Sequence, residues 1–287
     1  MAQDRGLSVT ALARTAQPET PGIAWVTGTL DDRQALDRLC EGADAVIHVA
    51  AAINAHDRAG FAAANIAGTA ALVDAANRAG IDRFVHTSSL AARQPEMSNY
   101  GWSKAESEAV VRDSATGWTI VRPPTVYGPG DRETLILFRL AALGFVPLPP
   151  AGRLSLLHAD DLAALLIDLG LRGAAVGAVI EPDDGRNGGW SHAEFAEALG
   201  RAVGRRVQPL PLPAWTIAMG ARVDEWRSRL RRRPPRLSRD RARYIVHPDW
   251  TVAASARPDA TFWSPSIDTE TGLEATVRWY RHQGWLR

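Results

Sequence analysis

The chain has 287 residues, with 33 Lys plus Arg against 32 Asp plus Glu, and its formal net charge is +1. A charge so close to zero argues against a general affinity for nucleic acids or other polyanions. The single cysteine, Cys40, excludes an internal disulfide and fits a reducing compartment. No apolar run approaches the length of a membrane span, and the polar amino terminus does not resemble a signal peptide. We therefore expect a cytoplasmic protein with no transmembrane segment and no nucleic-acid partner.

Strands and helices alternate through the first 170 residues. The predicted strands are 8–14, 23–26, 45–50, 83–89, 117–122 and 155–158. The predicted helices are 31–39, 65–78, the segment that begins at Tyr100, 134–144 and 160–170. The stretch 123–131 is so rich in Pro and Gly that we expect a loop there. This alternation predicts an α/β fold built on a doubly wound parallel sheet with helices on both faces.

The last third of the chain differs in composition and no longer alternates strands with helices, which predicts a smaller lobe. Ser191, with Glu194 at capping-box spacing, predicts a helix through Leu199, and 271–285 predicts a closing amphipathic helix. Between them lies a segment rich in Trp and Arg, which includes Trp215, Trp226 and the run 231–236. We interpret the Trp residues as core of the lobe and the Arg run as a solvated face and loop. The alternative is a patch for an anionic substrate, a membrane surface or a partner.

Tyr100 and Lys104 carry the strongest chemical signal. They stand four residues apart, so on a helix both side chains project from one face. Lys104 is the only lysine of the chain, and its compact ammonium favours the phenolate form of a neighbouring tyrosine. The pair therefore supplies a proton donor and acceptor near neutral pH, and a hydroxyl of Ser88 or Ser89 can hold a carbonyl oxygen. Such parts suit hydride transfer to or from a carbonyl or alcohol; the alternative is a solvated lysine beside a half-buried tyrosine.

Over nearly its whole length the sequence resembles the extended short-chain dehydrogenases/reductases, also called the NAD-dependent epimerase/dehydratase family. The motifs that carry the resemblance are His48-Val-Ala-Ala51, Asn65-Ile-Ala-Gly-Thr69, Phe84-Val-His-Thr-Ser-Ser89, Tyr100 to Lys104, Arg122-Pro-Pro-Thr-Val-Tyr-Gly-Pro-Gly-Asp131 and Leu157-His-Ala-Asp-Asp-Leu162. The resemblance implies a dinucleotide-binding, Rossmann-like domain over 1–170. It also implies a mainly substrate-binding lobe over 171–287, with some segments returning to the main sheet, and a homodimer.

The resemblance also implies roles for individual residues. Ser89 matches the catalytic serine, Tyr100 the acid/base, and Lys104 the residue that lowers the tyrosine pKa and holds the nicotinamide ribose. The further cofactor-binding positions are Arg14, Thr29, Leu30, Val49, Ala50, Ala51, Ser88, Pro123 and Pro124. At the position of Arg14, an acidic residue binds the ribose hydroxyl of NAD, whereas Arg accommodates the phosphate of NADP. Because no Asp or Glu lies between Val9 and Gln17, NADP is favoured over NAD.

The sequence departs from the family at its start and around the serine pair. It lacks the opening strand, glycine-rich phosphate loop and helix, and we therefore expect an N-terminally truncated Rossmann-like fold. The two explanations are a start codon assigned too late and a real truncation. Thr29 stands where the family commonly has Asp. About ten residues separate Ser89 from Tyr100, fewer than in sugar-nucleotide epimerases, and Leu90 follows the serines where dehydratases carry Thr, Asp and Glu. Dehydration is therefore disfavoured.

We predict an NAD(P)-dependent oxidoreductase that transfers a hydride between its cofactor and a small or hydrophobic alcohol or carbonyl substrate. The alternatives are a sugar-nucleotide epimerase of the same family and a non-catalytic nucleotide-binding or scaffold protein. The histidines His48, His86 and His158 lie on different predicted strands without metal-ligand spacing, so we expect no metal site.

Overall fold

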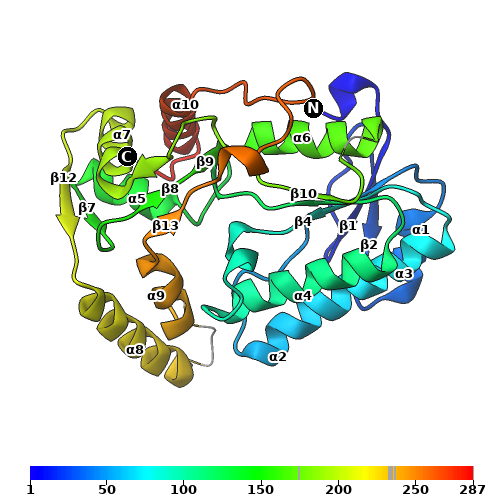
Figure 1. The fold of residues 1–287 in the computed structure, drawn as a ribbon, viewed down its shortest axis with the longest axis horizontal. Coiled ribbons are helices and arrows are strands. Elements are labelled where there is room, and N and C mark those ends of the chain that lie inside the picture. Colours follow the sequence, from blue (N-terminus) through cyan, green and yellow to red (C-terminus); the bar gives the residue numbers. More distant parts are fainter. Residues whose placement is uncertain (174, 232–234, 236, 287) are drawn as a thin grey trace. The chain divides into compact units, whose positions relative to one another are not determined.

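The computed structural model describes residues 1–173, 175–231, 235 and 237–286. The chain forms two compact units, of which unit 1 comprises Met1–Arg122 and Ala163–Ile180 and unit 2 comprises Pro123–Leu162 and Glu181–Arg287. It leaves unit 1 after Arg122, returns at Ala163 and leaves again after Ile180 (Figure 1). The units therefore do not follow the expected division at residue 170, because 123–162 belong with the C-terminal part of the chain.

The strands of unit 1 are all parallel, as the sequence predicts. The pair β1 (Val9–Ala13) and β2 (Ile23–Thr27) forms one sheet. The strands of the second sheet, in spatial order, are β10 (Ala178–Ile180), β5 (Trp118–Val121), β4 (Phe84–Thr87) and β3 (Val46–His48). Each is a short apolar run bounded by turns, which is typical of strands covered on both faces. Among the described residues, β3 is an edge strand of this sheet.

Helices cover both faces of the parallel strands of unit 1. Figure 1 shows α1 (Arg33–Cys40), α3 (Gly68–Arg78) and α4 (Asn99–Ser114) on one side and α6 (Ala159–Arg172) on the other. The short helices are η1 (Gln3–Arg5), α2 (Arg58–Phe61), the π-helix η2 (Ala62–Ala67) and η3 (Leu90–Arg93). One hydrophobic cluster joins α1 and α3 to strands of both sheets. The prediction of a doubly wound, Rossmann-like α/β fold is confirmed.

The expectation that no apolar run approaches the length of a membrane span is wrong, because one helical stretch of the described chain, Arg58–Arg78, is long and apolar enough by composition to cross a membrane. It runs through α2, η2 and α3 without a break. Leu72, Val73 and Ala76 on it are buried in the cluster of unit 1. A core helix passes the same test of length and composition, and the packing of these side chains gives Arg58–Arg78 that role.

Unit 2 contains short strands in three small sheets. Strand β6 (Thr125–Tyr127) pairs with β9 (Leu156–His158), and β7 (Phe145–Leu148) pairs with β12 (Gln208–Pro211). In the third sheet β8 (Arg153–Leu154) lies between β11 (Trp190–Ser191) and β13 (Asp249–Trp250). The prediction that 123–131 is only a loop is thus wrong, because β6 forms within it by pairing with β9.

The helices of unit 2 surround an apolar core. They are α5 (Leu135–Ala142), α7 (His192–Val203), α8 (Ala214–Arg231), α9 (Arg239–Val246), the 3₁₀ helix η4 (Ala254–Ala256) and α10 (Thr269–His282). The capping box of Ser191 and Glu194 is present, as predicted. Side chains of α5, α7 and α10 form the core cluster. Trp190 lies in that cluster, but Trp215 and Trp226 are exposed, so the prediction that these two belong to the core is wrong.

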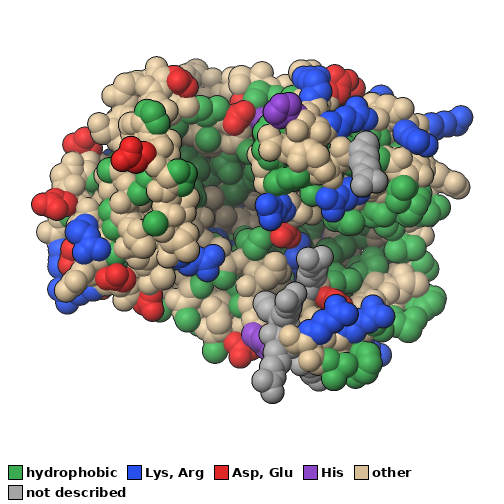
Figure 2. All heavy atoms as spheres, turned by 180° about the vertical axis from the view of Figure 1, so that it is seen from behind, with side chains coloured by type: hydrophobic (Ala, Val, Ile, Leu, Met, Phe, Trp, Pro, Cys, Tyr) green, Lys and Arg blue, Asp and Glu red, His purple; other side chains and the backbone are tan. Residues whose placement is uncertain are grey.

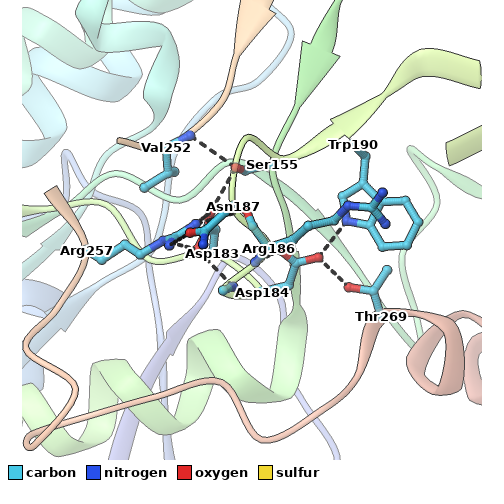
Figure 3. A network of polar contacts seen from close by, with 10 residues as sticks. Ser155, Asp183, Asp184, Arg186, Asn187, Trp190, Val252, Arg257 and Thr269 are labelled. Carbon is cyan, nitrogen blue, oxygen red and sulfur yellow. Dashed lines mark hydrogen bonds and ion pairs between the residues drawn. The ribbon is translucent and has the colours of Figure 1, made fainter. Parts of the chain in front are cut away.

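Two adjacent carboxylates, Asp183 and Asp184, tie separate segments of unit 2 together (Figure 3). Asp183 is buried and accepts hydrogen bonds from Nε and Nη2 of Arg257 at 2.8 and 3.0 Å. Asp184 accepts hydrogen bonds from Nε1 of Trp190 and Oγ1 of Thr269, both at 2.7 Å. Because Trp190 begins β11 and Thr269 begins α10, this network fixes the return of the chain into unit 2.

Candidate active site

The helix that carries Tyr100 and Lys104 begins at a well-formed cap. Oγ of Ser98 accepts a hydrogen bond from the Gly101 N–H at 2.9 Å, and α4 starts at Asn99. Tyr100 therefore lies in the first turn, half-buried, with Lys104 one turn later on the same face. Its ring contacts that of Phe61, with a centroid separation of 6.3 Å. The predicted helical setting of the pair is confirmed.

Lys104 is buried, with 2% of its surface exposed. Its Nζ donates a hydrogen bond of 2.7 Å to the carbonyl oxygen of Thr87, the last residue of β4. Burial lowers the pKa of Lys104 to about 8, while the Glu108 carboxylate acts in the opposite direction. This environment excludes the alternative of a solvated helix lysine. It holds the ammonium at the carboxyl end of a parallel strand, where open α/β sheets place their ligands.

The two serines after β4 have different surroundings. Ser88 is buried, and its hydroxyl donates a 2.5 Å hydrogen bond to Oε1 of Glu108. Ser89 is half-buried and caps η3 by accepting the N–H of Ala91 at 3.2 Å, so its own hydroxyl hydrogen is available to a substrate oxygen. Helix α4 packs closely on η3, since a Cβ at Gly101 would lie 2.7 Å from the Ala91 carbonyl oxygen. Ser89 thus caps η3 and Tyr100 lies in the first turn of α4, and these two elements are in direct contact.

Glu108 is a residue of this region that the sequence interpretation missed. It lies one turn after Lys104 on α4, and only 1% of its surface is exposed. Arg122 donates to both carboxylate oxygens, from Nε at 2.8 Å and from Nη2 at 2.7 Å, and Arg112 adds a 2.7 Å bond to Oε2. Burial alone would raise the pKa of Glu108, but the hydrogen bonds from Arg122 and Ser88, together with the positive charges of Arg122 and Arg112, outweigh it and the net shift is downward. The carboxylate is therefore ionised, and it holds α4 in place one turn after Lys104 through its bonds to Arg122 and Ser88.

Asn65 joins the loop after β3 to α4. Its side-chain amide bonds both backbone groups of Ala52, the N–H at 2.6 Å and the carbonyl at 3.0 Å. The same amide nitrogen donates to Oγ of Ser103 at 2.9 Å. The residue is buried in the π-helix η2, a distortion that is common at functional sites. Its motif marked the family resemblance, but these partners lie far away in the sequence and the sequence interpretation assigned Asn65 no role.

The buried histidines of the sheet are neutral. Burial lowers the pKa of His48 to about 3, and it lowers the pKa of His86 well below its ordinary range. Thr69 uses its hydroxyl hydrogen on the Asn65 carbonyl, so Nε2 of His48 donates the 3.0 Å bond to Thr69 Oγ1. In the part of the chain that the structure describes, no three His, Cys, Asp or Glu side chains gather as a metal site.

The expected cofactor positions of unit 1 lie at the carboxyl ends of its strands. Val49, Ala50 and Ala51 follow β3 and are exposed, and Asn65 fixes the backbone just beyond them. Arg14 follows β1 and is exposed; after β2 come Thr29, which is exposed and bonds Asp31, and Leu30, which is half-buried. An elongated anionic dinucleotide fits these strand ends, because most of their residues are exposed and because Arg14 and Lys104 carry positive charge. Pro123 and Pro124 belong to unit 2.

We expect the charge of Lys104 to make stability depend on pH. Its pKa in the fold is about 8, against 10.5 ordinarily, so the unfolded chain binds more protons between these values. The charged ammonium therefore destabilises the fold below about pH 8, and the free energy of unfolding rises with pH through this window, on the order of 3 kcal/mol in total. Urea unfolding of the wild type and Lys104→Met across this pH range measures the effect. The free energy of unfolding of the wild type, relative to that of Lys104→Met, should rise with pH. A difference that stays constant would contradict the prediction.

Comparisons with known proteins agree with this fold. A family model described as NAD(P)H-binding matches residues 1–138. The ceramide reductase of Caulobacter vibrioides is 40% identical over 264 residues, which cover 91% of this chain and 81% of that protein. The UDP-glucose 4-epimerase of Vibrio cholerae is 27% identical over 238 residues, 72% of this chain and 71% of that protein. The solved structure of MoeE5 in complex with UDP-glucose and NAD has a TM-score of 0.74 at 19% identity, covers 98% of this chain and 93% of its own, and shows the fold.

The parallel sheet, the Tyr100 and Lys104 pair, the NAD(P)H-binding family model and the similarity to a reductase together define an NAD(P)-dependent oxidoreductase. The chain belongs to the extended short-chain dehydrogenase/reductase family, as its motifs predict.

Proposed function

We propose that this oxidoreductase acts on the carbonyl or alcohol group of a hydrophobic, ceramide-like lipid. The observation that carries the proposal is the 40% identity to a ceramide reductase over 91% of this chain. A lipid agrees with the substrate class that the sequence favours, a small or hydrophobic alcohol or carbonyl. The short segment between Ser89 and Tyr100 also supports a substrate other than a nucleotide sugar.

In the proposed mechanism, side chains of unit 1 handle the proton. The nicotinamide, when bound, supplies or accepts the hydride. Tyr100 gives its phenol proton to the carbonyl oxygen during reduction and takes it back during oxidation. Ser89 donates a hydrogen bond to the same oxygen, and the Lys104 ammonium favours the phenolate that remains on Tyr100. Glu108 and Asn65 act indirectly, because they hold α4 against the strand ends.

We assign dinucleotide binding to unit 1 and substrate binding mainly to unit 2. The support for unit 1 is its set of exposed strand ends together with the NAD(P)H-binding family model over 1–138. Pro123 and Pro124, at the start of unit 2, are proposed to contact the nicotinamide. We also propose a cytoplasmic location, which one buried free cysteine favours, and a homodimer.

We further propose that NADP(H) is preferred over NAD(H), with Arg14 binding the 2′ phosphate. Arg14→Ala is expected to weaken NADPH binding about tenfold or more, because a charge-assisted hydrogen bond contributes roughly 1.5–3 kcal/mol. NADH binding should change less than about twofold. Fluorescence titration with each nucleotide measures both constants. Arg278→Ala, which removes an exposed arginine of α10, is the matched control, and equal losses for the two nucleotides would count against the assignment.

The proposed activity is tested by incubating this protein with NADPH and a keto-ceramide and following the oxidation of NADPH. We expect NADPH oxidation that depends on the lipid ketone and no reaction with UDP-glucose. The V. cholerae relative makes the epimerase the competing function. Interconversion of UDP-sugars without added cofactor, in the absence of ketone reduction, would replace our proposal by that one. Nucleotide binding without either reaction would support the non-catalytic alternative.

A further inference from the structure

Helix α8 presents a continuous apolar stripe to solvent. Five of its side chains are between 44% and 68% exposed, and they are Trp215, Met219, Val223, Trp226 and Leu230. The intervals between them are 4, 4, 3 and 4 residues, the spacing of one helix face. At a rise of about 1.5 Å per residue, the stripe from Trp215 to Leu230 extends along about 23 Å of the helix. So large an exposed apolar row, with two tryptophans, marks an interaction surface.

The opposite face of α8 is the one that packs on unit 2. Ala221 is fully buried. The Asp224 carboxylate accepts the Leu237 N–H at 2.8 Å, and Glu225 accepts the Arg239 N–H at 2.8 Å and pairs with the Arg239 side chain at 3.1 Å. These contacts fasten α8 to the segment that leads into α9. The apolar stripe is therefore held outward by the packing of the other face.

The flanks of the stripe are positively charged. Arg222 borders it on one side, Arg227 and Arg231 border it on the other, and all three are exposed. The two acidic residues of α8, Asp224 and Glu225, are less exposed and are engaged in the contacts with Leu237 and Arg239. Figure 2 shows hydrophobic and basic side chains side by side at the lower right, over the region of α8. The outward face thus combines an apolar strip with cations.

We propose that the outward face of α8 docks the protein on the surface of a lipid bilayer that contains anionic headgroups. An amphipathic helix with Trp and Leu on one face and Arg beside it lies in the membrane interface with its apolar side among the acyl chains. Tryptophan rings favour the headgroup level, and each arginine near an anionic surface adds about 1 kcal/mol of attraction. The stripe runs straight along one helix, so all of its side chains can enter a bilayer surface together. The arginines beside it carry the charge opposite to that of lipid phosphates. The proposal does not depend on the oxidoreductase activity.

Vesicle flotation of the full chain tests this surface. The wild type is expected to float with phosphatidylcholine vesicles that contain about one third phosphatidylglycerol, with a blue shift of its Trp fluorescence. Trp215→Ala combined with Trp226→Ala should reduce partitioning by about tenfold or more. Arg222→Gln combined with Arg227→Gln should reduce it mainly at low salt, because salt screens headgroup charge. The matched control is Ile136→Ala with Leu143→Ala, which removes two equally exposed apolar side chains elsewhere in unit 2.

The outcomes separate the membrane from other occupants. Loss of flotation in the Trp variant but not in the Ile136→Ala, Leu143→Ala control, with circular dichroism and thermal unfolding unchanged, supports the proposal. Wild-type protein that stays with buffer, or a Trp variant that floats as well as the wild type, overturns it. Trp-dependent dimerisation in sedimentation equilibrium without vesicle binding also overturns it, since the stripe would then be a contact between two copies.

Discussion

Tyr100→Phe is expected to reduce turnover by about 10²- to 10⁴-fold and to leave the dissociation constant for NADPH within about twofold of the wild type. The substitution removes only the hydroxyl that is proposed to exchange the proton. The ring keeps its place against Phe61 in the first turn of α4. Single-turnover kinetics with the lipid ketone measures the first effect, and fluorescence titration measures the second.

A second phenol serves as the control for Tyr100. Tyr280→Phe removes a hydroxyl that donates a 2.6 Å hydrogen bond to the Asp131 carbonyl oxygen. It should lower stability by about 1 kcal/mol and leave the rate of the chemical step unchanged. Turnover by Tyr100→Phe at the rate of the wild type would contradict the proton-transfer role of Tyr100. A tenfold loss of NADPH affinity in the same variant would instead indicate that this hydroxyl mainly binds cofactor.

Glu108→Ala is expected to lower the free energy of unfolding by about 3–5 kcal/mol, a large share of the roughly 5–15 kcal/mol that stabilises a typical native protein. The alanine leaves the guanidinium groups of Arg112 and Arg122 without their shared carboxylate, and it leaves the Ser88 hydroxyl without its acceptor. Breaking a buried pair from one side costs more than the pair contributes, because the charge left behind is poorly solvated. Urea unfolding followed by circular dichroism measures the loss.

Two variants of the same helix control this result. Glu106→Ala removes an exposed carboxylate of α4 and should change stability by less than about 0.5 kcal/mol. Glu108→Gln keeps the shape of the side chain but loses its charge, so we expect an intermediate loss. If Glu108→Ala were no more harmful than Glu106→Ala, the anchoring role of the carboxylate would be wrong.

The sequence predicted most elements of unit 1 because their signals are local. Apolar runs bounded by turns identified β3, β4 and β5, and four-residue spacing put Tyr100 and Lys104 on one face of α4. Strand β6 was missed because three residues inside a Pro-rich stretch carry no pattern of their own. They become a strand only by pairing with β9, which lies about thirty residues further on.

The surroundings of the site could not be predicted in the same way. The contacts of Glu108 with Arg122 and of Asn65 with Ser103 join residues 14 and 38 positions apart, and nothing in their local sequence announces the partner. The stripe of α8 illustrates a different limit. Spacing indicates that Trp215 and Trp226 share a helix face, but the same pattern describes a covered face and an exposed one. Only the packing of Asp224 and Glu225 shows which face of α8 turns inward.

The burial of the only lysine gives the protein a built-in spectroscopic reporter. Protein made with isotope-labelled lysine will give one side-chain resonance in a nitrogen or carbon NMR spectrum, and that resonance belongs to Lys104. No assignment experiment is needed. Its chemical shift followed across pH reads the ionisation of the ammonium directly, and its displacement on adding a nucleotide reports occupancy at the Thr87 end of β4.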